Sequence, residues 1–343
     1  MQREITTPGK LLDSNGNLVE KGYARSLIKE YDRKDVKAPN WRIKEWDYYL
    51  IYDENYAIAL TLDDNTYMGL RSVSVIDFKN KRELTLSPMS FFTGGKTNLP
   101  KSSKKGDVSY KDKKVEMDFS HIEGGRKLVC RMPNYYKKDE FYCELSLTDE
   151  PADSMVILTP FDKKKHFYYN QKIVGFKVEG YFKVGQFTYN FNKNTSRGIL
   201  DWGRGVWTYK NTWYWGAGCG TIDGHEVGFN IGYGFGNTEY ATENVVFYDG
   251  VLHKLENVEF NIPKNEMGKY LYEDKWTFTS SDKRFEMEFE PIIDRHSDTN
   301  VILIGSFQHQ VFGKFSGRLI LDDGTQIELK DFIGFAERVY NKW

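Results

Sequence analysis

The chain has 343 residues, of which 40% are hydrophobic and 28% are charged, a balance typical of a globular protein with a sizeable core. Its formal net charge is -1, so no overall basic field attracts nucleic acid or an anionic membrane surface, and neither is expected as a main partner. Aromatic residues make up 16% of the chain, and because Tyr, Phe and Trp favour strands, the composition indicates a sheet protein.

The first forty residues are polar and rich in turn signals. They contain no apolar segment of the kind found in secretory signal peptides, and no run of about 18 apolar residues follows anywhere in the chain. The three cysteines lie at unrelated spacings, which favours buried reduced thiols and a cytoplasmic location without a membrane span. Residues 1–40 are predicted to form an arm that wraps a core, with one short helix at 22–31.

From Trp41 onward apolar and polar residues alternate with a period of two, as they do in strands. A segment rich in Gly, Ser and Lys at 94–114 predicts a long loop. Residues 41–175 are predicted to form a first β domain, with strands at 46–52, 56–62, 67–78, 115–119, 126–132, 141–147 and 155–158.

A second series of strands begins near residue 175, which predicts a second β domain at 176–343. Asp323-Gly324 is a strong hairpin signal near its end. The fold is therefore predicted to be all-β, with little helix and two consecutive antiparallel barrel or sandwich units packed together. The expected strands are 176–184, 187–191, 213–217, 227–233, 245–248, 253–260, 276–280, 285–289, 301–307, 311–320 and 326–335.

The densest cluster of aromatic residues lies in the second series. Half of the eight tryptophans occur there, as Trp202, Trp207, Trp213 and Trp215. In a strand, Trp213 and Trp215 share one face and Tyr214 lies on the other. One aromatic face would pack the core and the other would line a cavity. Trp202, Trp207, Tyr214 and Trp215 are therefore predicted to bind a ligand.

Asp201 and Arg204 are the ionisable residues of this segment. Gly203 and Gly205 flank Arg204, so the backbone there can bend and let a ligand approach closely. Asp201 is a candidate general acid whose pKa an apolar setting would raise, and Arg204 would orient a polar group of the substrate. Alternatively, the two residues form a structural pair that holds a tight turn.

The block at 228–236 alternates glycine with aromatic and apolar residues, and Asn230 and Tyr233 within it are further candidate binding residues. Its three alternating glycines differ from a phosphate-binding fingerprint, because that motif needs another spacing and a following helix. The pattern favours a curved barrel wall, in which glycines make room for bulky neighbours.

Two more candidate catalytic residues lie further along the chain. Glu243 is a second carboxylate, and two carboxylates that flank a pocket would suit glycosidic chemistry. His309 lies on an alternating strand, either as a catalytic base or as an interior histidine with satisfied hydrogen bonds. No metal is predicted, since H-x-H and HExxH spacings are absent; no cofactor is predicted, and no G-x-S-x-G elbow is present.

Several motifs distributed over nearly the whole chain resemble an uncharacterised family, the domain of unknown function 2804. They include the opening segments, the Asp-Trp-Gly-Arg-Gly-Val-Trp block and the ending Gly-Phe-Ala-Glu. This resemblance names a family without naming a reaction. The matching segments are 8–12, 16–17, 22–26, 41–49, 201–207, 230–236 and 334–337.

A more distant resemblance is to two-domain, lipocalin-like proteins that include carotenoid hydratases and lipocalin-type Diels–Alderases. In those proteins the ligand lies between two β domains, which implies a pocket near 201–215 here. The related hydratases carry a His in the Asp-containing turn, whereas this chain has none between His166 and His225, so hydratase chemistry is not carried over. The segments that resemble them are 200–203, 213–215 and 312–317.

Two functions are consistent with these patterns. The first is an enzyme that acts, without a cofactor, on a small molecule that is partly apolar or carbohydrate-like, by acid–base chemistry of the hydrolase, lyase or isomerase type. The second is a non-catalytic, lipocalin-like binding protein for a lipid or metabolite. A pocket that holds converging charged groups would favour the first, and a wholly apolar pocket would favour the second.

Overall fold

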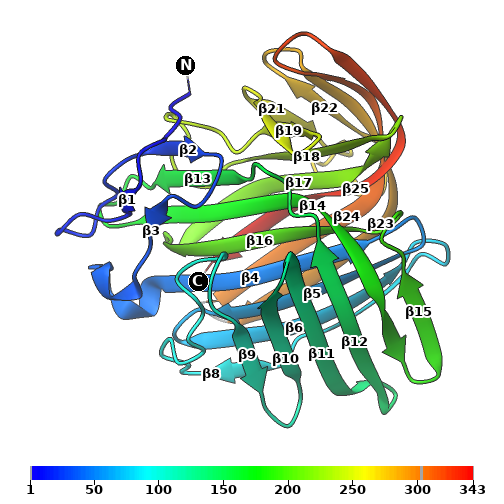
Figure 1. Cartoon of the computed structure of the whole chain (residues 1–343), viewed down its shortest axis with the longest axis horizontal. Helices are drawn as coiled ribbons and strands as arrows, with labels where there is room; N and C mark the ends of the chain where they lie inside the picture. Colours follow the sequence, from blue (N-terminus) through cyan, green and yellow to red (C-terminus); the bar gives the residue numbers. More distant parts are fainter. Residues whose placement is uncertain (1, 302–303, 343) are drawn as a thin grey trace.

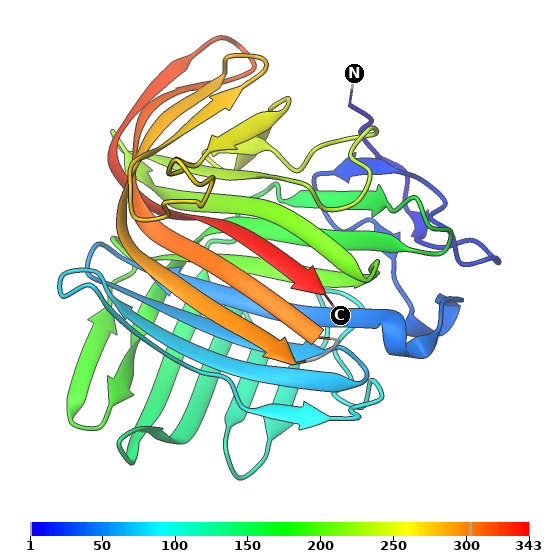
Figure 2. The same cartoon turned by 180° about the vertical axis from the view of Figure 1, so that it is seen from behind.

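The computed structural model describes residues 2–301 and 304–342, and almost all of its regular structure is β-sheet (Figures 1 and 2). Two large sheets pack against each other, with antiparallel pairing throughout both. The predicted all-β, two-unit, lipocalin-like fold with little helix is confirmed. The expected strand at 301–307 includes residues 302–303, which lie outside the described part of the chain.

The first sheet has 14 strands. They are β2 (Gly22–Ala24), β4 (Ile43–Tyr52), β5 (Tyr56–Asp64), β6 (Met68–Asp77), β7 (Arg82–Leu86), β8 (Met89–Phe91), β9 (Val108–Lys111), β10 (Glu116–Ile122), β11 (Gly125–Tyr136), β12 (Asp139–Thr148), β13 (Met155–Pro160), β14 (Phe167–Val184), β15 (Phe187–Phe191) and β16 (Arg197–Val206). The main order is β7-β6-β5-β4-β16-β14-β12-β11-β10-β9. The late strand β16 therefore lies between β4 and β14, so distant parts of the chain meet at the centre of the sheet.

The second sheet has 9 strands, in the order β20-β19-β18-β17-β25-β24-β23-β22-β21. Their bounds are β17 (Lys210–Ile222), β18 (His225–Tyr233), β19 (Val245–Tyr248), β20 (Val251–Lys254), β21 (Val258–Asn261), β22 (Trp276–Ser280), β23 (Phe285–Val301), β24 (Ile304–Ile320) and β25 (Gln326–Lys342). The last three strands are the long orange and red arrows of Figure 2.

The change from the first sheet to the second comes at 207–209, between β16 and β17. The boundary suggested by the sequence, at residues 175 and 176, falls inside β14. A register shift interrupts β14 there, and Gly175 at the shift has a φ of 117°, so the strand bends without leaving its sheet. The apparent restart of the strand pattern is this bulge.

The N-terminal arm contains short strands and turns. The expected helix at 22–31 is wrong: β2 pairs there with β13, and β3 (Lys29–Glu30) pairs with β1 (Gly9–Lys10). The arm closes with the 3-10 turns η1 (Arg33–Asp35) and η2 (Asn40–Arg42). Backbone pairing with a sheet edge outweighs the weak local preference for helix.

Three apolar clusters form the core, one inside each unit and one between the two sheets. Strand β16 separates two of them. Leu200, Trp202 and Val206 face the core of the first unit, whereas Ile199 faces the layer between the sheets. This is the period-two alternation of a strand that is buried on both faces.

Candidate functional site

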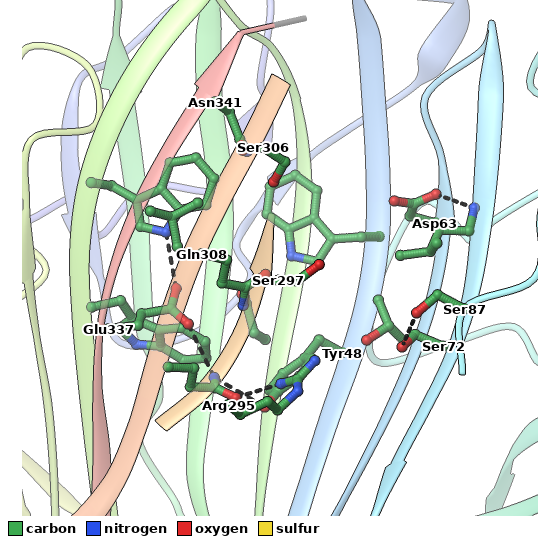
Figure 3. A pocket seen from close by; sticks show the side chains of 18 of the residues that line it. Tyr48, Asp63, Ser72, Ser87, Arg295, Ser297, Ser306, Gln308, Glu337 and Asn341 are labelled. Carbon is green, nitrogen blue, oxygen red and sulfur yellow. Dashed lines mark hydrogen bonds between the residues drawn. The ribbon is translucent and has the colours of Figure 1, made fainter. Parts of the chain in front are cut away.

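A cavity of about 540 Å³ lies between the two sheets, within the size range of small-molecule sites. Side chains enter it from both sides, as Figure 3 shows: Asp63, Ser72 and Ser87 from the first sheet, and Gln308 and Glu337 from the second. Its aromatic lining comes from Trp46, Tyr48, Tyr168, Trp207, Trp213, Trp215 and Phe235.

The cavity occupies one end of the layer between the sheets, and the other end is filled by packed apolar side chains. On β24, Phe312 belongs to the packed end, whereas Gln310 and Gln308, two and four residues earlier on the same face, line the cavity. On β25, Phe335 and Glu337 show the same change. The strands therefore continue while their inward side chains turn polar, which opens a site without a break in the sheet.

Gly203 allows Trp46 to lie across β16 and form part of the aromatic wall. A Cβ on Gly203 would lie 1.9 Å from Cζ2 of Trp46, so any side chain at this position would displace the indole. Trp46 in turn stacks on Tyr168, at 6.1 Å between ring centroids, and meets Trp207 edge-on at 5.0 Å. The absence of a side chain at Gly203 therefore determines where the Trp46 indole of the neighbouring strand lies, and with it the shape of the aromatic wall.

Asp201 lies in the cavity wall with a cation beside it. Its carboxylate is 2.9 Å from Nζ of Lys172, the residue opposite it on β14, and its Oδ1 accepts a hydrogen bond of 2.5 Å from Asn170. The Lys172 ammonium lies 3.8 Å from the centre of the Trp215 ring. Asp201 and Lys172 are both almost fully buried, so this is a charged pair in a low-dielectric setting rather than a surface salt bridge.

Glu243 is a half-buried carboxyl that lines the same cavity, in the segment between β18 and β19. Burial raises its pKa, the charge of Lys172 opposes that rise, and the charge of Asp201 adds to it. Its Oε2 has no hydrogen-bond partner among the described residues. Asn230 holds this segment in place, because its side chain donates to the Glu243 carbonyl and accepts from Nε1 of Trp215.

Glu337 is the carboxyl that sequence reasoning missed as a site residue. It is buried on β25, and burial raises its pKa to about 7, although a hydrogen bond from Trp213 and the charges of Lys172 and Arg295 favour the ionised form. Trp213 donates to Oε1 and Gln310 donates to Oε2, each at 3.0 Å. The signal in the sequence was a Glu two residues after Phe335, on an inward-facing position of the strand.

Arg295 completes the polar chain at this end of the cavity. Its Nη1 donates to Oε1 of Gln310 at 2.5 Å, and the amide of Gln310 donates to Glu337 and, at 3.4 Å, to the hydroxyl of Tyr48. Figure 3 shows Arg295 beside Tyr48 and near Glu337. These partners define the orientation of the Gln310 amide, because its oxygen faces Arg295 and its nitrogen faces Glu337 and Tyr48.

The facing wall combines hydroxyl groups with carboxyl, amide and apolar side chains. The hydroxyls of Ser72 and Ser87 are 2.9 Å apart, and Thr85 donates to Ser74 behind them. Asp63 on this wall accepts from the backbone of Leu70, and burial raises its pKa to about 7. The cavity therefore offers aromatic faces together with hydroxyl, amide and carboxyl groups.

Arg204 and Trp202 do not line the cavity, because they lie on the opposite face of β16 from Asp201. Arg204 is fully buried, 3.0 Å from Asp47, and donates to the carbonyls of Trp46 and Pro100. Its guanidinium also lies 4.3 Å from the Trp202 ring centre. The suggested pairing of Asp201 with Arg204 is absent, since each has its own partner on the neighbouring strands.

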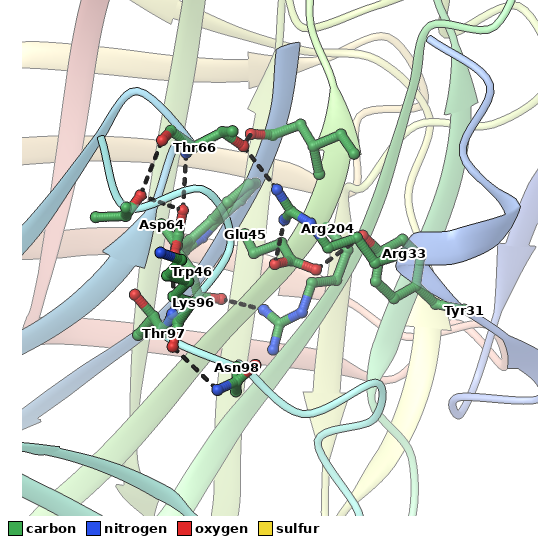
Figure 4. A network of polar contacts seen from close by, with 12 residues as sticks. Tyr31, Arg33, Glu45, Trp46, Asp64, Thr66, Lys96, Thr97, Asn98 and Arg204 are labelled. Atoms are coloured by element: carbon green, nitrogen blue, oxygen red, sulfur yellow. Dashed lines mark hydrogen bonds and ion pairs between the residues drawn. The ribbon is translucent and has the colours of Figure 1, made fainter. Parts of the chain in front are cut away.

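Arg204 lies close to the polar network that attaches the arm (Figure 4). Arg33 donates to Oε2 of Glu45 at 2.5 Å and to Oγ1 of Thr66 at 2.7 Å, and Tyr31 donates to the other oxygen of Glu45. Glu45 is itself buried on β4. These contacts join the arm to the central sheet behind the cavity, so we assign them to the architecture and not to the site.

Three further candidate residues lie outside the cavity wall. Tyr214 stacks on Tyr233 at 4.4 Å, on the face of β17 and β18 that packs into the second unit. His309 faces away from its neighbour Gln310; it pairs with Asp294 at 2.7 Å and stacks on Tyr272 at 3.7 Å. Strand alternation explains the positions of Tyr214 and His309, because each is one position out of phase with the cavity-lining side chains of its strand, and Tyr233 lies opposite Tyr214 on the neighbouring strand.

Of the residues proposed from the sequence, the structure brings Asp201, Glu243, Trp207 and Trp215 into one cavity, with Asn230 in direct support. In the part of the chain that the structure describes, no group of three or more His, Cys, Asp or Glu side chains could hold a metal ion. No helix in the same residues is long and apolar enough to cross a membrane.

Comparison with solved structures finds matches at low sequence identity. A crystal structure of a protein from Nitrosomonas europaea, whose assignment as AttH is provisional, matches with a TM-score of 0.52 and 12% identity, over 90% of this chain and 95% of that one. Kievitone hydratase from Nectria haematococca matches with a TM-score of 0.46 and 11% identity, over 98% of each chain. CghA in complex with Sch210972 matches with a TM-score of 0.40 and 8% identity, over 88% of each chain.

The likeness to the Nitrosomonas europaea protein concerns the fold only, because the identity is too low to transfer an activity. No curated protein matches the sequence significantly. A family model does match, over residues 2–343, and its description is domain of unknown function (DUF2804). The predicted family is confirmed: this chain belongs to the family of the domain of unknown function 2804.

Proposed function

We propose that this protein is an enzyme that performs acid–base chemistry on a small molecule bound between the two sheets. The observation that carries the proposal is the convergence of Glu337, Glu243 and the Asp201–Lys172 pair on one cavity. Burial shifts the pKa of Glu337 to about 7 and raises that of Glu243. Carboxyl groups poised near the working pH are the usual agents of general acid and base catalysis.

The roles follow from the surroundings of each group. Glu337 exchanges a proton near neutral pH, so it can act either as the acid or as the base. Glu243 has an oxygen without a partner among the described residues and is the second proton-transfer group. Asp201 orients Lys172, whose ammonium lies over Trp215 in the wall. Two proton-transfer groups in one enclosure suit elimination, addition, isomerisation or hydrolysis, so the reaction is of the lyase, isomerase or hydrolase type.

The substrate in this proposal is partly apolar and carries polar groups. The aromatic wall would stack on a ring or on an extended hydrocarbon, and the hydroxyl wall around Ser72 and Ser87 would bind oxygen atoms. A non-catalytic carrier would use the same aromatic wall. The charged groups favour the enzyme, because a buried carboxyl oxygen without a hydrogen-bond partner among the described residues, such as Oε2 of Glu243, costs stability and has no use in a carrier of apolar ligands.

The test starts from a substrate found by screening metabolites for turnover, or from a small molecule that copurifies with the protein. We expect Glu337→Gln and Asp201→Asn each to reduce kcat by about 100-fold or more with the fold intact by circular dichroism, because each removes a proton-transfer or charge-positioning group. Glu290→Gln, a change at an exposed position on β23, is the matched control.

The pH profile separates catalysis from binding. We expect kcat/KM of the wild type to change around pH 7, where Glu337 titrates, and this limb to disappear in Glu337→Gln. A ligand that binds tightly but is never converted, with an affinity that neither carboxyl variant alters, would show that the protein is a carrier.

A further inference from the structure

Arg295 is the cation of the cavity that has no acidic partner. Lys172, the other basic side chain in the wall, lies 2.9 Å from Asp201. Within residues 2–301 and 304–342, by contrast, no carboxylate oxygen lies within 4.0 Å of the Arg295 guanidinium, and its one hydrogen bond goes from Nη1 to Gln310. A half-buried arginine without an ion pair is uncommon unless a ligand or solvent satisfies its donors.

The geometry around Arg295 leaves its carboxylate-binding donors available. The bond to Gln310 fixes the guanidinium, because Gln310 is itself held by Glu337 and Tyr48. Nε and Nη2 have no partner among the described residues, and this edge of a guanidinium matches the two oxygens of a carboxylate. An arginine that is held at one nitrogen is oriented for such a contact before the ligand arrives.

The balance of charge in the cavity also permits an anion. Asp201 is neutralised by Lys172, and burial raises the pKa of Glu243, Glu337 and Asp63, which shifts these carboxyls toward the neutral form. The guanidinium of Arg295 keeps its full charge. Glu83 also lines the cavity, but among the described residues no carboxylate oxygen lies within 4.0 Å of the Arg295 guanidinium, so this charge at the end near Tyr48 has no direct ion-pair partner beside the aromatic wall.

We propose that Arg295 binds a carboxylate group of the substrate, so that the cavity selects carboxylic acids with an apolar ring or hydrocarbon body. This inference rests on the proposed function, because it places the substrate in the same cavity. The proposed contact also predicts the orientation of the ligand in the cavity. The carboxylate lies at Arg295, the apolar body lies along Trp213 and Trp215, and Glu337 lies next to the anchored end, linked to Arg295 through Gln310.

The test compares acids with their primary amides, which have nearly the same shape but no charge. The probes are 1-naphthylacetate and geranate, each with its amide, titrated against tryptophan fluorescence at neutral pH. We expect the wild type to bind each acid at least about tenfold more tightly than its amide, because a charge-assisted pair is lost in the amide. Arg295→Gln should lower the affinity for the acids to that for the amides and leave the affinity for the amides unchanged.

Two further variants make the result specific. Arg295→Lys keeps the charge but loses the planar fork, so its preference for acids should be intermediate. Arg131→Gln removes an exposed arginine, which pairs with Glu140 on the first sheet, and should behave as the wild type.

Equal binding of acid and amide by the wild type, an equal weakening of both by Arg295→Gln, or no binding of any of the four probes would overturn the inference. Failure of the proposed catalysis gives a different pattern. In that case the acids bind through Arg295, while Glu337→Gln and Asp201→Asn leave the turnover of an identified substrate unchanged.

Discussion

At the scale of single residues, the cavity depends on side chains whose protonation is set by burial. Glu337 is the clearest example, because two hydrogen bonds favour its ionised form and burial still raises its pKa to about 7. In the unfolded chain the same carboxyl titrates near its ordinary value of 4.5. The folded protein therefore holds a proton on Glu337 in a pH range in which the unfolded chain has released it.

This difference predicts how stability depends on pH. The raised pKa means that Glu337 destabilises the fold progressively as pH rises from about 4.5 to about 7, with no further change above that range. We expect the free energy of unfolding of Glu337→Gln, relative to wild type, to rise across this window by up to about 3–4 kcal/mol, at about 1.4 kcal/mol per pKa unit. Urea unfolding at a series of pH values measures it. A difference that is constant with pH would show that folding does not raise the pKa of Glu337.

Gly203 gives a second prediction at this scale. In Gly203→Ala the new Cβ would meet the Trp46 indole at 1.9 Å, so we expect a loss of about 1–3 kcal/mol in unfolding free energy, with a change in tryptophan fluorescence as the wall of the cavity moves. Gly124→Ala is the comparison, because a Cβ there meets no atom within 4 Å and only the φ of +73° opposes it. An unchanged spectrum and full stability in Gly203→Ala would contradict the assigned role of this glycine.

At the scale of elements, strand β16 separates architecture from site. Its cavity-facing side carries Asp201, and its other side carries Arg204, which is buried against Asp47. The sequence placed both residues in one site because they are three positions apart in a bent, glycine-rich segment. The segment is a continuous strand instead, and an odd spacing in a strand puts two side chains on opposite faces.

The two faces should respond differently to mutation. Arg204→Met leaves Asp47 buried without its partner, and we expect it to cost about 3–5 kcal/mol of stability. The double variant Asp47→Asn/Arg204→Met should recover part of this loss, since no uncompensated charge remains. Thermal or urea unfolding of the four proteins completes the cycle. Equal stability of Arg204→Met and wild type would show that the pair contributes nothing.

At the scale of the whole molecule, the two sheets share one packed layer and are expected to unfold together. Tyr52 of β4 links them directly: its hydroxyl accepts from the backbone N–H of Cys219 at 2.6 Å and donates to the carbonyl of the same residue at 3.0 Å. The surrounding layer combines apolar side chains from both sheets, such as Leu50 and Phe335. Apolar side chains fill one end of this layer, and the cavity occupies its other end.

Tyr52→Phe tests this coupling. The change leaves a buried backbone N–H without its partner, so we expect a loss of about 1–3 kcal/mol. Far-ultraviolet circular dichroism and tryptophan fluorescence should shift together if the sheets unfold as one unit. Tyr142→Phe, which removes a hydroxyl bonded to Glu144 within β12, is the control and should change stability by less than about 0.5 kcal/mol. Separate transitions by the two probes would show that the units are independent.

The amino-acid sequence by itself determined the class of fold and the alternation within each strand. The period of two between 213 and 217 correctly put Trp213 and Trp215 on one face and Tyr214 on the other, because successive side chains of any strand point to opposite sides. The same rule assigned the aromatic segment to a cavity wall. Composition and residue spacing are local properties of the chain, so they can be interpreted without knowing which strands pair with each other.

Only the tertiary structure decided which face became the site and which distant residues joined it. Lys172 reaches Asp201 because β14 pairs with β16, and Glu337 reaches Trp213 because β25 pairs with β17. Burial then raises the pKa of Glu337, an effect that depends on what packs around a carboxyl and not on its neighbours in the chain. Strand pairing and burial are long-range properties, which is why the sequence pointed to Trp207 and Trp215 but not to Trp46 and Tyr168 on other strands, nor to Lys172 and Glu337.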